Sequence, residues 1–347
     1  MLALILLCGC AAQDKTEPNK TDFICGVWIS CYELDKMLTG GEFKAEFSRL
    51  CENLNALGCS DAFVHCRAFS DSLFNSKYYP QKENTLSYGF DILEYMIAEL
   101  KAVKVRFHAW INPFRTANGD FSNPADISVQ TGVLCGIREI IENYDVDGVH
   151  FDDYFYPANS DETDSETFAG YKSAAVSPLE KGEWRRANIT SLVFAARDII
   201  KESKKDIVFS ISPAADTDKN YNSSFADVKT WCESGAVDYI IPQLYFGFDY
   251  PDESFTFGAL LKKWKKLSGK AKLIIGLAAY KLGTDSPPDS EEWQSGENIL
   301  ARQTEICLKD TAVSGVCYFS CTYLFAEDTL HAASTERIIK TLKKRTD

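Results

Sequence analysis

Residues 147–157 read Asp-Gly-Val-His-Phe-Asp-Asp-Tyr-Phe-Tyr-Pro. In this stretch a short β-rich run at residues 148–151 leads into two adjacent carboxylates, Asp152 and Asp153, and then into three aromatic residues. Carboxylates at the end of a strand, beside flat aromatic surfaces, suit a site that protonates a glycosidic oxygen and stacks on sugar rings. The competing interpretation is that Asp152 caps a helix or turn and that the aromatic residues belong to the core.

Outside this stretch, the chain alternates between short β-rich runs and longer segments with helical periodicity. Apolar residues that recur every 3.6 positions predict helices at residues 43–57, 92–102, 133–143, 189–203, 257–266 and 298–309. Gly58 and Gly235 mark the ends of two helices. The β-rich runs occupy residues 24–30, 61–67, 105–112, 148–152, 207–212, 237–245, 273–280 and 315–320. This alternation predicts an α/β fold, a single (β/α)8 TIM barrel.

Because successive side chains of a strand point to opposite sides, the predicted strands each have one apolar face and a second face that carries polar residues near the C-terminal end of the strand. Gly148, His150 and Asp152 share one face, while Val149 and Phe151 share the other. The second, third and fifth predicted strands follow the same pattern, and their polar side chains gather towards the C-terminal ends. Barrel enzymes build their sites at that end, so the pattern predicts an enzyme. Long loops at residues 70–88, 154–184, 245–255 and 282–296 are expected to wall the site.

Asp152 and Asp153 are the predicted catalytic carboxylates. The parity of Asp152 points it into the barrel mouth, and we expect it to be the charged member of the pair, whereas Asp153 lies past the strand end. When two carboxyl groups lie close together, one stays ionised, and its negative charge raises the pKa of the other. Because adjacent side chains rarely face a common point, Glu166 and Asp164 are the alternative acid or supporting groups, unless they are solvated loop acids.

Polar and aromatic side chains at other predicted strand ends complete the groove. Guanidinium and amide groups suit sugar hydroxyls, acetamido groups or a carboxylate, and tryptophan rings suit stacking on sugars. Each residue alone is as easily a structural polar group or a core ring. The predicted substrate-binding residues are Trp28, Arg67, Trp110, Asn112, Arg115, His150, Tyr154, Gln243 and Tyr245.

Three histidines support a competing hypothesis. His65, His108 and His150 fall on consecutive predicted strands with the same parity, and with Asp152 they form a candidate metal site. His65 and His108 precede the polar strand ends, which places them deeper in the barrel and favours buried, hydrogen-bonded histidines instead. The sequence has no Ser-His-Asp motif, phosphate-binding loop or dinucleotide fingerprint. We expect no metal and no cofactor, with a metal-dependent hydrolase or deacetylase as the less favoured alternative.

The N-terminus resembles an export signal. Residues 1–10 form an apolar run that is too short to span a bilayer. Leu7-Cys8-Gly9-Cys10 resembles a bacterial lipobox, in which Cys10 would carry the lipid, although no Lys or Arg precedes the run. We expect residues 1–9 to be a lipoprotein-type signal, residues 10–22 a linker and residues 23–347 the barrel. This organisation predicts an exported bacterial protein of the cell envelope that touches the membrane only through an N-terminal lipid anchor.

Length, charge and cysteine content limit the kinds of partner that the chain can have. The chain has 347 residues, enough for one large core, and a net charge of −13. A net charge this negative argues against a nucleic-acid-binding protein, which would carry an excess of basic residues, and it predicts no affinity for anionic membranes. Ten cysteines remain when Cys8 and Cys10 are set aside, and their spacing matches no zinc motif, so we interpret them as buried thiols. We expect a monomer.

Several segments resemble the bacterial glycosyl hydrolase-like 10 family of exported (β/α)8 proteins. The matching segments are Gly26-Val27-Trp28, residues 64–67, residues 71–80, residues 108–115, residues 147–157, residues 184–188 and residues 238–245. The chain departs from the family pattern at Cys66 and at Gln81-Lys82-Glu83. The resemblance implies a glycosidase fold that acts on carbohydrate, with peptide-free peptidoglycan strands as the implied substrate.

Residues 147–154 also loosely resemble the chitinase-type signature Asp-Gly-x-Asp-x-Asp-x-Glu. His150 and Tyr154 stand where that signature has its second Asp and its Glu. The general acid of that mechanism is therefore absent, and catalysis assisted by an N-acetyl group needs another proton donor. We expect a glycoside hydrolase of β-linked amino-sugar glycans that uses carboxylate chemistry. The alternative is a carbohydrate-binding lipoprotein without activity.

Overall fold

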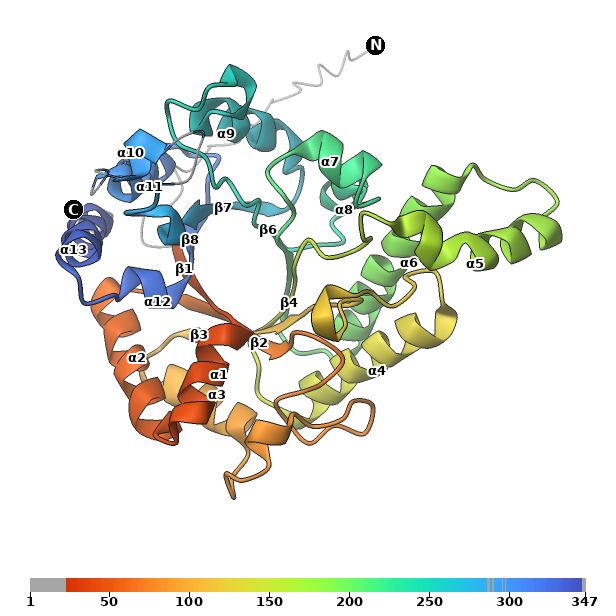
Figure 1. Ribbon diagram of the computed structural model, residues 1–347, viewed down its shortest axis with the longest axis horizontal. Coiled ribbons are helices and arrows are strands. Elements are labelled where there is room, and N and C mark those ends of the chain that lie inside the picture. The colour runs from red at the N-terminus through yellow and green to blue at the C-terminus, as the bar shows by residue number, and fades with distance from the viewer. Residues whose placement is uncertain (1–22, 286–287, 289, 295, 297, 345–347) are drawn as a thin grey trace, which may run out of the picture.

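Eight parallel strands close into a barrel in the order β1-β2-β3-β4-β5-β6-β7-β8. The computed structural model describes residues 23–344 except 286–287, 289, 295 and 297. Figure 1 looks along the barrel, with helices around the strands. The strands are β1 (Ile24–Ile29), β2 (Asp61–Arg67), β3 (Arg106–Ile111), β4 (Gly148–Phe151), β5 (Val208–Ile211), β6 (Tyr239–Ile240), β7 (Lys272–Ala278) and β8 (Gly315–Phe319). The predicted (β/α)8 fold is confirmed.

Helices connect the strands and cover the outside of the barrel. They are α1 (Cys31–Gly40), α2 (Phe43–Leu57), α3 (Ile92–Ala102), α4 (Ile127–Asn143), α5 (Ser160–Ala174), α6 (Lys181–Glu202), α7 (Thr217–Asn222), α8 (Val228–Ser234), α9 (Phe257–Leu267), α10 (Ser290–Gln294), α11 (Ile299–Lys309), α12 (Cys321–Leu324) and α13 (Thr329–Lys343). Short 3-10 turns are η2 (Glu83–Thr85), η3 (Ala117–Gly119), η4 (Glu253–Phe255) and η5 (Ala279–Lys281). Within the described residues, no helix combines the length and the apolar character that a membrane crossing needs.

Local sequence explains where these helices begin and end. Gly58 and Gly235 adopt φ of 77° and 76° directly after α2 and α8, as the sequence predicts. A left-handed conformation of this kind strains residues that carry a Cβ, so glycine ends the helix there. Asp91 begins α3 by accepting a hydrogen bond from the backbone of Glu94.

The outward face of the strands and the inward face of the helices form the main hydrophobic core. Val149 and Phe151 of β4 belong to this core, together with Phe107 of β3 and Phe209 of β5. The barrel interior is a separate, smaller cluster that contains Trp28, Phe63, Trp110, Tyr239 and other residues. The predicted alternation of faces therefore holds, because strands in a barrel place successive side chains inside and outside.

Two glycines make room for large rings inside the barrel. A Cβ on Gly148 would lie 2.0 Å from Nδ1 of His108. A Cβ on Gly276 of β7 would lie 3.0 Å from the Trp28 ring and 2.9 Å from the carbonyl oxygen of Pro242. The Trp28 indole can lie across the barrel only because β7 has no side chain at residue 276.

Two expectations from the sequence need correction. The strand predicted at residues 237–245 is only Tyr239–Ile240. Pro242 has no backbone N–H and interrupts the regular pairing, which resumes only as isolated bridges from Gln243 to Ala214 and Gly276. The predicted loop at residues 154–184 contains α5, whose buried residues are only Ser160 and Asp164. A helix without an apolar stripe gives no periodic signal, and in Figure 1 α5 projects away from the barrel.

The predicted export signal at residues 1–9, with Cys10, and the linker at residues 10–22 lie outside the described residues. The ten cysteines from Cys25 to Cys321 are all free in the structure. Nine of the ten are buried, and Cys135 is half-buried.

Candidate active site

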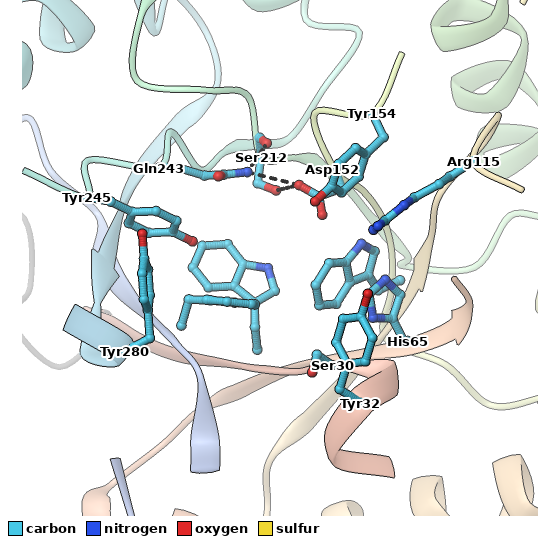
Figure 2. A pocket seen from close by; sticks show the side chains of 13 residues that line it. Ser30, Tyr32, His65, Arg115, Asp152, Tyr154, Ser212, Gln243, Tyr245 and Tyr280 are labelled. Carbon is cyan, nitrogen blue, oxygen red and sulfur yellow. Dashed lines mark hydrogen bonds between the residues drawn. The ribbon is translucent and has the colours of Figure 1, made fainter. Parts of the chain in front are cut away.

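Every strand of the barrel contributes to one cavity at the C-terminal end. The cavity has a volume of about 250 Å³, slightly below the roughly 300–1,000 Å³ of common ligand pockets. Figure 2 shows its side chains converging from opposite sides of the barrel mouth. The lining residues are Trp28, Ser30, Tyr32, His65, Trp110, Arg115, Asp152, Tyr154, Ser212, Gln243, Tyr245, Tyr280 and Phe319. The convergence depends on barrel closure, since these residues are scattered along the chain.

Asp152 is the carboxyl group of this cavity. It follows the last residue of β4 and is 7% exposed. Its Oδ1 accepts hydrogen bonds from Nε2 of Gln243 at 2.9 Å and from Oγ of Ser212 at 3.3 Å, both drawn in Figure 2. Burial raises the pKa of Asp152 well above its ordinary range, and the charge of Asp153 raises it further. Asp152 is therefore held protonated, ready to donate.

Asp153 is half-buried beside Asp152 and does not line the cavity. Its backbone N–H donates to Oδ1 of Asp152 at 2.8 Å. Burial raises the pKa of Asp153, while hydrogen bonding to Asp152 and the positive charge of Lys219 act in the opposite direction. Of the two carboxyls, Asp152 has the more strongly raised pKa and is therefore the preferred site of a proton. This assignment reverses the expectation from sequence that Asp152 is the charged member of the pair.

Two tryptophans among the lining residues have their polar edges occupied. Nε1 of Trp28 donates to Nε2 of His150 at 3.1 Å, and Nε1 of Trp110 donates to Oδ1 of Asn112 at 3.1 Å. The Trp110 ring also stacks on His65, with ring centroids 3.3 Å apart. Because both N–H groups are used, the indoles present carbon surface to the cavity, and such a surface suits the apolar face of a sugar ring.

Arg115 brings positive charge to the cavity. Its guanidinium lies 4.4 Å from the centre of the Tyr154 ring and 5.1 Å from that of Phe69. Figure 2 shows it pointing towards the cavity from the side of Asp152. No carboxylate pairs with Arg115 within the described part of the chain. Its donors are therefore available to an anionic group of a ligand.

Tyr245 and Tyr280 form the opposite wall. Their ring centroids are 5.6 Å apart at an interplanar angle of 82°, and Tyr245 stacks at 6.1 Å on Phe319. Figure 2 shows the hydroxyl of Tyr245 turned into the cavity. Burial raises the pKa of Tyr245 well above its ordinary range, so the hydroxyl stays protonated and can donate a hydrogen bond.

Three predicted substrate-binding residues lie behind the cavity instead of lining it. Arg67 donates to the carbonyl oxygens of Asn112 and Pro113, and its guanidinium lies 4.5 Å from the centre of the Tyr79 ring. Asn112 is fully buried, and its side-chain amide donates to the carbonyl oxygen of Ala68 at 3.0 Å. His150 is fully buried between Trp28 and Ser210. His150 positions the Trp28 indole by a contact between β4 and β1, and Asn112 positions the indole of Trp110, two residues before it in the chain.

Glu166 and Asp164, the alternative acids, also lie outside the cavity. Glu166 is exposed on α5. Asp164 is 1% exposed, and its carboxylate accepts hydrogen bonds from Nε and Nη2 of Arg185, each at 2.7 Å. Asp164 therefore fastens α5 to α6, and neither residue reaches Asp152.

The three histidines bind separate partners. Nδ1 of His65 accepts from the backbone N–H of Cys31 at 3.0 Å, and Nε2 of His108 lies 2.7 Å from Oδ1 of Asp61. His150 accepts from Trp28, so its other nitrogen donates to Oγ of Ser210 at 2.8 Å. Across the described residues, no three His, Cys, Asp or Glu side chains gather as metal ligands. The arrangement matches the interpretation of buried, hydrogen-bonded histidines.

The substrate-binding prediction from sequence omitted six of the lining residues: Ser30, Tyr32, His65, Ser212, Tyr280 and Phe319. Ser212 and His65 carried a signal, since each lies on the polar face of its predicted strand. Tyr32 and Tyr280 lie in segments after β1 and β7, where strand parity no longer applies.

Comparison with known proteins agrees with this geometry. The profile of the family described as glycosyl hydrolase-like 10 matches residues 115–295. The glycosyl hydrolase YngK of Bacillus subtilis (strain 168) is 29% identical, over 85% of this chain and 67% of its own. The glycosyl hydrolase DigH of Escherichia coli (strain K12) is 28% identical, over 85% of this chain and 78% of its own.

Solved structures share the fold. The glycoside hydrolase domain of PgaB (BpsB) from Bordetella bronchiseptica superposes with a TM-score of 0.66 at 12% identity, over 90% of this chain and 98% of that domain. A family 18 N-acetylglucosaminidase from Paenibacillus barengoltzii gives a TM-score of 0.55 at 16% identity, over 93% and 99% of the two chains. The family profile covers more than half of the 347 residues, so the chain belongs to the glycosyl hydrolase-like 10 family and is a glycosidase by class.

Proposed function

We propose that this glycosidase cleaves β-linked amino-sugar glycans, with peptide-free peptidoglycan strands as its substrate in the bacterial cell envelope. The observation that carries the proposal is the arrangement of carboxyl groups. Asp152 is the only carboxyl among the described residues that line the cavity, and Asp153 is close enough to affect its pKa. Glycosidases that use two protein carboxylates hold them at least about 5 Å apart, on either side of the glycosidic bond.

A carboxyl pair that holds one proton can act as the acid, but it leaves the nucleophile unassigned. A 2-acetamido sugar supplies one, since its carbonyl oxygen can attack the anomeric carbon. In this mechanism Asp152 gives its proton to the leaving glycosidic oxygen as the acetamido oxygen forms a bond to C1. Water then opens the resulting oxazolinium ion and returns a proton to Asp152. The substrate must therefore be an N-acetylated amino sugar.

The other walls of the cavity support the same class of substrate. Gln243 lies next to Asp152, and the Tyr245 hydroxyl points into the cavity from the opposite wall, so that the two can hydrogen-bond an acetamido group bound between them. The Trp28 and Trp110 surfaces suit the ring itself. Arg115 suits a carboxylate, and in peptidoglycan the lactyl carboxylate of the muramic acid residue is free only when the peptide has been removed.

The test is release of new reducing ends from peptide-free glycan strands, with intact peptidoglycan and neutral N-acetylglucosamine oligomers in parallel. Wild-type activity should fall by two or more orders of magnitude in Asp152→Asn, since loss of a general acid costs roughly 10²–10⁴-fold. Asp153→Asn should be impaired less. Binding of the strands without release of reducing ends would instead indicate a carbohydrate-binding protein.

A further inference from the structure

A second cavity, of about 550 Å³, lies at the opposite end of the barrel from the active site. Arg106, Tyr239 and Lys272, which line it, are the first residues of β3, β6 and β7. Six cationic side chains and two carboxylates surround it: Arg106, Arg197, Lys201, Lys205, Lys270 and Lys272, with Asp206 and Asp238. This local excess of positive charge stands in a chain whose net charge is −13.

The two arginines are paired with carboxylates, whereas the lysines are not, although Lys205 donates to the carbonyl oxygen of Ile141 and Lys272 lies over the Tyr239 ring. Nη2 of Arg106 donates to Asp61 at 2.9 Å, and Nη1 of Arg197 donates to Asp238 at 2.5 Å. We call Lys201, Lys205, Lys270 and Lys272 the N-terminal lysine cluster; all four are exposed. Over the described ranges of the chain, none of the four has a carboxylate within ion-pair distance.

Lysines on the surrounding helices also lie at this end of the barrel. In a (β/α)8 barrel the helices run antiparallel to the strands, so their last turns lie at the N-terminal end of the barrel. Lysines occupy the last turns of α3, α6, α9, α11 and α13. Acidic residues occupy the first turns of α2, α3, α5 and α6, at the active-site end. Helix dipoles favour each placement individually. Lys101, Lys265, Lys309 and Lys340 are nevertheless paired with the nearby carboxylates of Asp145, Asp310, Glu305 and Glu336, so the unpaired lysine cluster, and not the helix ends as a whole, distinguishes this face.

The N-terminal segment joins the barrel at this same end. β1 begins at Ile24, so residues 1–22 are attached at the face that carries the lysine cluster. That segment starts with the apolar run that contains Cys10. If Cys10 is lipidated, residues 11–22 span at most about 40 Å when extended, which keeps the barrel within its own diameter of the membrane.

We propose that the N-terminal face of the barrel docks on the anionic surface of a phospholipid membrane, with head-group phosphates against the lysine cluster. The active-site cavity then opens away from the membrane, towards the glycan. The proposal revises the expectation, drawn from net charge, that the chain has no affinity for anionic membranes.

The experiment is co-sedimentation of the full chain with vesicles. Cys8→Ser and Cys10→Ser prevent lipid attachment, so that the protein surface is measured alone. We expect binding to phosphatidylglycerol vesicles at low salt, weaker binding at physiological salt, and little binding to phosphatidylcholine vesicles. Each lysine near an anionic surface is worth about fivefold in binding. Replacing the four lysines of the cluster with Gln should therefore weaken binding by about two orders of magnitude or more.

A matched variant provides the control. Lys36, Lys77 and Lys172 are also exposed but lie in the segments that follow β1, β2 and β4, at the active-site end of the barrel, and their replacement with Gln should change binding by no more than about twofold. Circular dichroism and release of reducing ends from soluble glycan should be normal in both variants. Equal binding by the two variants, or no preference for phosphatidylglycerol, would overturn the proposal. Binding to polyphosphate in solution but not to the vesicles would assign the cluster to an anionic polymer and also overturn it.

Discussion

Asp152 illustrates how a single buried carboxyl links stability to pH. Its pKa is raised in the folded chain, so the folded state binds more protons than the unfolded state between the unfolded pKa, about 4, and the raised value. Stability of the wild type therefore falls as pH rises through that window. Asp152→Asn keeps the Oδ1 acceptor for Gln243 but cannot ionise. We expect its free energy of unfolding, relative to wild type, to increase from pH 4 to pH 8 in urea titrations. A difference that stays constant over this range would contradict the assignment.

The acetamido mechanism predicts retention of configuration. Attack by the acetamido oxygen and then by water inverts the anomeric carbon twice, so the first product is the β anomer. Proton NMR of the products in the first minutes distinguishes it from the α anomer. A de-N-acetylated glycan should not be cleaved, because it lacks the nucleophile. Initial release of the α anomer would contradict the mechanism, because it would mean that water attacks the anomeric carbon directly. A second group, separate from the general acid, would then have to act as the general base.

Arg115 is predicted to select for a carboxylate on the substrate. A hydrogen bond to a charged group is worth about 1.5–3 kcal/mol, or roughly 10–100-fold in affinity. Arg115→Gln should raise KM for peptide-free strands by about this factor and change KM for neutral N-acetylglucosamine oligomers little. For Arg115→Lys we expect a KM between those of the wild type and Arg115→Gln, since lysine keeps the positive charge but lacks the planar guanidinium group that binds a carboxylate through two hydrogen bonds. An equal loss on both substrates would show that Arg115 only supports Tyr154.

At the scale of elements, ion pairs of Asp161 and Asp164 with Lys181 and Arg185 join α5 to α6, and the buried pair between Asp164 and Arg185 is the one that we expect to matter most. Asp164 and Asp161 both bind Arg185, but the side chain of Asp164 is 0% exposed and that of Asp161 is 78% exposed. Removing one partner of a buried pair costs about 3–5 kcal/mol of folding free energy, whereas exposed pairs contribute little. Asp164→Asn should therefore release α5 and accelerate proteolysis at residues 160–180, and Asp161→Asn should not. Equal cleavage of both variants would contradict this assignment.

The strands show the same division between local and long-range causes. β2 matches its predicted bounds because turn signals, with Gly58 and Ser60 before it and Ser70 after it, bracket a short run centred on Phe63 and Val64. β6 is shorter than predicted because Pro242 has no N–H to donate to a neighbouring strand. The prediction rested on the β propensity of the residues, which does not take the lost hydrogen bond into account. α5 escaped prediction because it is fixed by charge pairs and not by a buried apolar stripe.

At the scale of the whole molecule, the cysteines are predicted to be unreactive thiols. Burial raises the pKa of Cys31 to about 11 and that of Cys51 to about 12, so little thiolate forms at neutral pH. A thiol reagent should label only Cys135 in the native chain from residue 23 onwards, and all ten cysteines in urea. Cys135→Ser should remove the native signal. A reductant should leave Tm unchanged, and a lower Tm would reveal a disulfide.

Local sequence alone was enough to predict the (β/α)8 fold and the position of Asp152. Strand and helix periodicity is a property of neighbouring residues, and strand parity fixes which side chains enter the barrel. The same parity placed Trp110 and Asp152 on the inner face, where the structure has them.

Only the tertiary structure decided which inner residues face the cavity and which support it. Arg67, Asn112 and His150 share the inner face with the lining residues, yet each is buried against another strand or loop. Depth along the barrel axis depends on strand register across the closed sheet, which no single segment encodes. The raised pKa of Asp152 and the lysine cluster at the N-terminal face likewise arise from burial and from several elements that meet only in the barrel. Both depend on groups that are distant in sequence and close only in the folded chain.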